Sequence, residues 1–139
     1  MPTERERYDE LCAYTLTHGD PAFIHQHVVD AFAAQNATES SKPIGVFFAL
    51  VGLYLHTEKG ISGRDVQRIH MRLAQRKRQW PAIALPRERG ATTAGDVMAA
   101  PAGPERDRAI DAWAAAVWNA FRDTKPLIDD VLQQHGIRV

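Results

Sequence analysis

The longest apolar run in the chain, Ile44–Leu55, constrains the fold more than any other feature of the sequence. Its twelve residues follow Pro43, which suits the first turn of a helix. Because a bilayer-spanning helix needs about 20 residues, the run predicts a buried helix over about 43–57 that is apolar nearly all round and central to the fold. Gly45 and Gly52 lie on one face of this helix, which predicts either the close approach of another backbone or room for a ligand.

Apolar residues recur at helical spacing in five further segments, separated by glycine and proline residues. The sequence contains no strand pattern and no internal repeat. We therefore predict an all-α fold, in which residues 1–139 form a single-domain helical bundle of about five main helices. A long irregular connection, 81–103, precedes the penultimate helix, and connections of this length are often functional. The five further segments are about 3–17, 21–34, 63–79, 104–123 and 125–135.

The composition is that of a globular domain, with 45% hydrophobic and 24% charged residues among 139. The formal net charge of zero gives no global attraction to nucleic acid or to an anionic membrane. The single cysteine, Cys12, excludes an intramolecular disulfide, which fits a reducing compartment. The first ten residues are charged and hold no apolar signal-peptide core, so we expect a cytoplasmic protein with no membrane partner.

Histidines are the strongest candidates for functional residues in this sequence, because an imidazole can ligate a metal or move a proton near neutral pH. Four of the six lie in predicted helices: His25, His27, His56 and His70. The first two cannot share a helix face, since a two-residue step turns about 200° around the axis. One of them is therefore expected to point inward. The other two histidines stand at predicted helix ends, where we expect no functional role: His18 and His135.

Three predicted helices can thus each contribute one imidazole to a common site. The predicted ligands of a divalent metal (Zn, Ni or Fe) are His27, His56 and His70. Asp30, three residues after His27 and on its face, is the candidate orienting or ligating carboxylate, and His25 replaces His27 if the helix phase differs. If the protein is an enzyme, such a metal would activate water for hydrolysis or group transfer on a small molecule. The alternative is ordinary core histidines, hydrogen-bonded to carboxylates and backbone.

Arginines recur every four residues along the predicted helix 63–79 and form one stripe: Arg64, Arg68, Arg72 and Arg76. Residues 62–89 hold eight basic and two acidic residues, so this segment carries +6 and the rest of the chain −6. The stripe predicts either a solvated helix face or a surface of a non-enzymatic module that binds an anionic partner. Aromatic residues are not interleaved along it, which makes nucleic acid the less favoured partner.

A third hypothesis concerns the aromatic residues of the predicted helix 104–123. Trp113, Trp118 and Phe121 recur at helical spacing and would line one face of that helix. If that face forms a subunit interface, the protein is a homodimer with a purely structural or interaction role.

Six short runs, distributed over nearly the whole chain, resemble an uncharacterised family of short bacterial proteins, a domain of unknown function. The resemblance implies a self-contained unit, and it brings no known activity, cofactor or ligand residues. The runs are Tyr8–Leu11, Tyr14–His18, Asp20–Ala31, Gly52–His56, Val66–Met71 and Trp80–Pro81.

Overall fold

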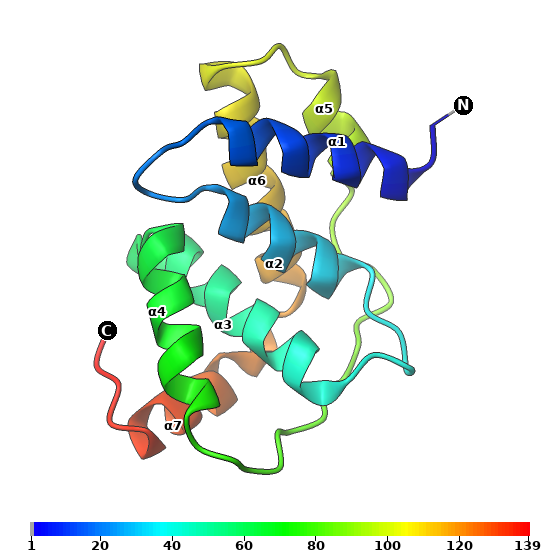
Figure 1. Cartoon of the computed structure of the whole chain (residues 1–139). Coiled ribbons are helices and arrows are strands. Elements are labelled where there is room, and N and C mark those ends of the chain that lie inside the picture. Colours follow the sequence, from blue (N-terminus) through cyan, green and yellow to red (C-terminus); the bar gives the residue numbers. More distant parts are fainter. Residues whose placement is uncertain (1) are drawn as a thin grey trace.

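The computed structural model describes residues 2–139, and within them it contains seven α-helices, one short 3-10 helix and no strand (Figure 1). The predicted all-α fold is confirmed. The count of about five main helices is too low, because the structure has six helices of ten or more residues and a further short helix, α5, in the long connection. The elements are α1 (Glu4–Thr17), α2 (His25–Gln35), α3 (Pro43–Lys59), α4 (Gly63–Ala74), α5 (Ala94–Ala99), α6 (Pro104–Ala120), η1 (Arg122–Thr124) and α7 (Lys125–Gln134).

Helix α3 is the centre of the fold, as its apolar sequence predicts. Nine of its 17 residues are buried, and it packs against α2, α4 and α6. Figure 1 shows α2 and α3 running beside one another. The core is completed by Trp113 and Trp118 of α6 and by Phe121, all of which are buried inside this one chain. These aromatic rings are therefore not available as a subunit surface.

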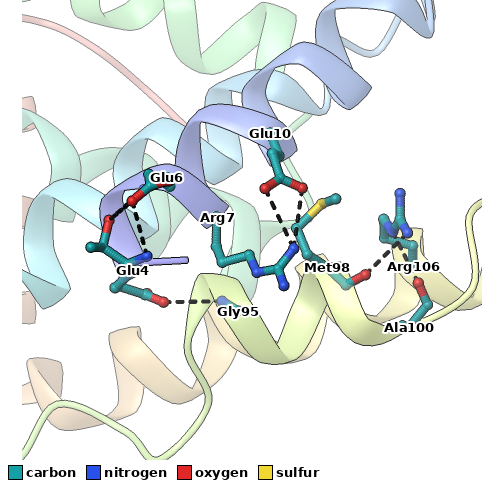
Figure 2. A network of polar contacts seen from close by, with 9 residues as sticks. Glu4, Glu6, Arg7, Glu10, Gly95, Met98, Ala100 and Arg106 are labelled. Carbon is teal, nitrogen blue, oxygen red and sulfur yellow. Dashed lines mark hydrogen bonds and ion pairs between the residues drawn. The ribbon is translucent and has the colours of Figure 1, made fainter. Parts of the chain in front are cut away.

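The short helix α5 is held at both ends by charged side chains (Figure 2). The Glu4 carboxylate of α1 accepts a hydrogen bond of 3.0 Å from the backbone N–H of Gly95 at the start of α5. The Arg106 guanidinium of α6 donates to the carbonyls of Ala100 (3.0 Å) and Met98 (3.1 Å) at its end. A carboxylate at the start of a helix and a guanidinium at its end complement the helix dipole, so α5 ties α1 to α6.

One arginine fixes the long connection after α4 to the end of α2. The Arg89 guanidinium donates to the carbonyls of Gln35 (3.2 Å), Ala37 and Pro86 (2.9 Å). The last carbonyls of a helix have no partner within the helix, and half-buried carbonyls that stay unpaired are destabilising. Arg89 therefore caps α2 and holds the connection against it.

We expect Arg89→Ala to lower the free energy of unfolding by about 2 kcal/mol, because hydrogen bonds from a charged donor contribute about 1.5–3 kcal/mol. The matched control is Arg87→Ala, in the same connection, where the side chain is exposed and little change is expected. Urea unfolding at pH 7 measures both variants. Equal losses in the two would contradict the capping role of Arg89.

Candidate functional site

An open cavity of about 410 Å³ lies where the segment 18–24, the end of α3, the start of α4 and one face of α6 meet. Most of the surface that lines it is apolar, and six titratable side chains reach it. They are His18, His27, His56, Asp20, Asp107 and Asp111. We call this the histidine cavity.

His27 and His56 form a stacked pair on the wall of the histidine cavity. Their ring centroids lie 3.4 Å apart with an angle of 17° between the planes. His27 is 3% exposed, and its Nδ1 is buried without a hydrogen-bond partner. Burial, with a smaller contribution from neighbouring His56, lowers the pKa of His27 to about 3. His27 is therefore a neutral imidazole at pH 7.

Both ring nitrogens of His56 face acceptors. Nδ1 lies 3.2 Å from the carbonyl oxygen of Ile61, and Nε2 lies 2.9 Å from Oδ1 of Asp111. Because a neutral imidazole carries only one N–H, the protonated ring is the form that satisfies both acceptors. The hydrogen bond from His56 lowers the pKa of the Asp111 carboxyl. The His56 ring is thus held at both nitrogens and lies stacked on the neutral ring of His27.

A second histidine–aspartate pair lies one helical turn away, since Asp107 and Asp111 are four residues apart on α6. Oδ2 of Asp107 lies 3.3 Å from Nε2 of His18, and Oδ1 accepts a hydrogen bond of 2.8 Å from the Tyr14 hydroxyl. The Tyr14 oxygen in turn accepts a hydrogen bond of 3.0 Å from the backbone N–H of Gly103. Burial raises the pKa of Tyr14, so Tyr14 stays a phenol that orients Asp107.

The rim of the histidine cavity is a tightly held turn. Phe23 has a φ of 57°, the left-handed region that costs a non-glycine residue about 1–3 kcal/mol. The backbone N–H of Arg64, at the start of α4, donates to the Ala22 carbonyl at 2.9 Å. A Cβ on Gly63 would overlap the Phe23 carbonyl oxygen, so only glycine allows this approach. The predicted helix start at Pro21 is therefore wrong: α2 begins at His25, after this turn.

A family model described as a family of unknown function, DUF5946, matches residues 5–122. The chain belongs to DUF5946. The match covers most of the chain and confirms the resemblance to an uncharacterised family. No curated protein and no solved structure matches the sequence. Within residues 2–139 of this DUF5946 chain, none of the helices combines the length and hydropathy that crossing a bilayer requires.

Of the five predicted metal ligands in this DUF5946 chain, the structure brings together only His27 and His56. His25 lies on the far side of α2, with Nδ1 2.9 Å from Oγ1 of Thr15. His70 donates from Nε2 to the Phe48 carbonyl at 2.7 Å and stacks on the Phe48 ring. Burial lowers the pKa of both. These two positions match the interpretation as core or boundary histidines.

Asp30, the fifth of these residues, is fully buried in the α2–α3 interface. Oδ1 accepts a hydrogen bond of 3.0 Å from the Gln26 amide, while Oδ2 has no partner. Burial raises the pKa of this carboxyl well above its usual value. A Cβ on Gly52 would overlap the carboxyl, whereas a Cβ on Gly45 would meet nothing. Gly52 is therefore approached by the Asp30 side chain, and the predicted approach of another backbone is wrong. Asp111, not Asp30, orients His56.

The residues present do not fit a metal ion in this arrangement. Within residues 2–139, no three His, Cys, Asp or Glu side chains are grouped as ligands of one ion. Both nitrogens of His56 are already engaged, and the one fully buried free nitrogen of His27 has no second ligand beside it. Binding of Zn, Ni or Fe by the predicted set stays a prediction that this geometry does not support.

Local sequence patterns do not identify the α6 carboxylates or His18 as site residues. His18 follows α1 directly, as its predicted place at a helix end requires, but its partner Asp107 lies 89 positions along the chain. Asp107 and Asp111 carry one local signal, their four-residue spacing on an amphipathic helix. Nothing local to α6 identifies two histidines as their partners, because those contacts exist only once α1, α3 and α6 have packed together.

Proposed function

We propose that this DUF5946 chain binds a small molecule in the histidine cavity and exchanges a proton with it through His18. The observation that carries the proposal is the pair of histidine–aspartate contacts on one face of α6, both opening onto one cavity whose lining surface is mostly apolar. Titratable groups with perturbed environments concentrate at functional sites, and concave, largely apolar pockets with a few convergent polar groups are typical of small-molecule sites.

His18 is the proposed general base. Its Nε2 donates to the Asp107 carboxylate, which fixes the tautomer and leaves Nδ1 with its lone pair. Nδ1 has no hydrogen-bond partner within residues 2–139, and the side chain is 30% exposed, so a bound molecule can reach it. A histidine with one nitrogen held by a carboxylate and the other free is the arrangement that general bases use.

His27 and His56 are the proposed binding and orienting groups. With a pKa of about 3, His27 is a weak base at pH 7. Only its Nδ1 is fully buried without a partner, so Nε2 is the nitrogen available to a ligand in the cavity. A neutral imidazole can donate a hydrogen bond to a carbonyl and polarise it. The His56 ring stacked behind it holds the plane of the His27 imidazole.

Proton NMR of small molecules in D₂O tests binding and proton exchange together. We screen a mixed set of small carboxylic acids, amides and amines. We expect at least one binder whose acidic C–H signal decays as His18 removes the proton and solvent returns a deuteron. His18→Gln is expected to retain binding and to slow this decay by about 10²-fold or more, which is the usual contribution of a general base.

Two aspartate variants serve as the matched pair for this experiment. Asp107→Asn is expected to slow the decay, because the amide no longer fixes the tautomer of His18. Asp123→Asn, at an exposed position in η1, is expected to leave it unchanged. A decay rate that is the same in wild type and His18→Gln would overturn the role of His18. The absence of any binder whose binding depends on His27 would overturn the proposal as a whole.

A further inference from the structure

A second hollow lies far from the histidine cavity, where the chain leaves α4 and passes α7. It measures about 350 Å³ and is lined by Arg76, Lys77, Arg78, Gln79, Gln134 and His135. Figure 1 shows the last turn of α4 above α7, and hydrogen bonds from the segment after α4 to Gln134 confirm that they meet. We call this the basic hollow.

The positive charge at the basic hollow is not neutralised within residues 2–139. None of Arg72, Arg76, Lys77 and Arg78 forms an ion pair there, whereas Arg68, earlier in the arginine stripe, is paired with Asp65 at 2.6 Å. All four cations are exposed. Like charges gathered on one short segment repel one another, so this arrangement favours an anion that is not part of the chain.

The two arginines of the basic hollow are held in place before any ligand arrives. Arg76 donates from Nη1 to the Gln134 carbonyl at 3.3 Å, and Arg78 donates from Nη1 to the Gln134 side-chain oxygen at 3.0 Å. The Arg78 guanidinium also lies over the Trp80 ring, 5.3 Å from its centroid. Each guanidinium keeps most of its five N–H donors free. Pre-organised donors lose less conformational entropy on binding.

The environment of His135 reports the electrostatics of the basic hollow. Its Nδ1 lies 3.1 Å from the Val131 carbonyl, and its Nε2 is buried without a partner. Burial lowers the pKa of His135, and Arg76, Arg78 and Arg72 lower it further. The ring therefore lies in a region of positive potential, and its titration will respond to any anion that enters.

We propose that the basic hollow binds a phosphoryl group. Two planar guanidinium forks and one ammonium around a single hollow match a tetrahedral dianion better than a carboxylate, because the forks can bond to separate phosphate oxygens. The Trp80 ring is covered by Arg78 and lies against His135 (5.9 Å between centroids, 11° between planes). It is therefore not a platform for base stacking, and recognition rests on phosphate alone.

The source of the phosphate is either a free phosphorylated molecule or the backbone of a nucleic acid. The rest of the arginine stripe bears on this choice. Arg72, Arg68 and Arg64 continue from the hollow along α4 at steps of about 6 Å, all exposed, although Asp65 neutralises Arg68 and the Arg64 guanidinium lies over the Phe23 ring at 5.3 Å. The unneutralised charge is therefore concentrated at the hollow.

The test is a titration with inorganic phosphate at constant ionic strength, followed by the imidazole NMR signals of His135. We expect saturable shifts and a rise in the pKa of His135 as the anion enters. Lys77→Gln with Arg78→Gln is expected to weaken phosphate binding by about tenfold or more, the loss that charged hydrogen bonds of this kind imply. The matched control, Arg108→Gln with Arg122→Gln, removes two exposed arginines elsewhere and is expected to leave binding unchanged.

A second arm uses a 20-base-pair DNA duplex in fluorescence anisotropy. Duplex binding that weakens steeply with salt and fails in the Lys77/Arg78 variant identifies a nucleic-acid backbone as the source. Phosphate binding with no duplex binding identifies a free phosphorylated molecule. The proposal is overturned if phosphate produces no saturable shift of His135, or if the two double variants lose binding equally. It is independent of the function proposed for the histidine cavity.

Discussion

Gly52→Ala is expected to destabilise the protein by about 2–3 kcal/mol, which is the effect of forcing atoms into a filled core. Intrinsic helix propensity alone predicts the opposite, a gain of about 1 kcal/mol from replacing a glycine inside a helix. The steric effect prevails because the new methyl group would overlap the Asp30 carboxyl, and because Val66 lies against the same position from α4. Neither neighbour can withdraw toward solvent, since both are buried.

Gly45→Ala is the matched control, because it makes the same substitution in the same helix at a position where a methyl group meets nothing. It is expected to raise stability by up to about 1 kcal/mol. Chemical denaturation of the two variants measures the difference between their free energies of unfolding. If Gly52→Ala proves as harmless as Gly45→Ala, the carboxyl of Asp30 does not lie against α3.

A double variant shows whether Asp30 causes the effect. In Asp30→Ala with Gly52→Ala the obstructing carboxyl is gone, so the second methyl group is expected to cost little once the first substitution has been made. The two substitutions should therefore be non-additive by about 1–3 kcal/mol, as expected for residues in direct contact. Additive losses would assign the effect of Gly52→Ala to another neighbour, Val66 being the other one within reach.

The sequence is sufficient to predict the central helix and one contact of the site. The apolar run Ile44–Leu55 predicts a buried helix, and α3 is one. The two-residue spacing of His25 and His27 predicts that they point in different directions, and only His27 reaches His56. Both predictions depend on helix periodicity, which is a property of neighbouring residues.

The rest of the site depends on contacts between distant segments, which local patterns do not encode. The backbone N–H of Arg64 donates a hydrogen bond to the Ala22 carbonyl, which holds this segment in a turn. Helix α2 therefore begins at His25, although Pro21 suits a helix start. The predicted extension of α4 to Gln79 is wrong as well: α4 ends at Ala74, and the arginines that follow it bind Gln134 instead. Arginine favours helices locally, but tertiary contacts override this preference.

Acid is expected to destabilise the protein through its buried histidines. The pKa of His27 falls from 6.5 to about 3 on folding, so the unfolded chain binds a proton below pH 6.5 that the folded protein excludes. The stability linked to His27 is therefore fully present above pH 6.5 and is lost progressively as the pH falls toward 3. At pH 4.5 the loss is about 3 kcal/mol. The lowered pKa values of His25 and His70 act in the same direction.

Asp30 acts in the opposite direction. Its pKa is raised on folding, so its contribution is greatest below 3.8 and declines as the pH rises from 3.8 toward its folded value. Over the acid range the protonation of Asp30 therefore offsets part of the loss caused by the histidines. Asp30→Asn removes this offset and is expected to make the acid-induced loss of stability steeper.

Urea unfolding at intervals from pH 4.5 to pH 8 separates these contributions, provided that the slope with pH is compared and not the absolute stability. His27→Gln is expected to flatten the acid slope, because the residue that excludes the proton is gone. His18→Gln is the control, since His18 lies at the exposed rim of the same cavity and is expected to leave the slope unchanged. If His27→Gln keeps the full wild-type slope, His27 is not a neutral, buried ring in the folded protein, and the role proposed for it in the histidine cavity fails with it.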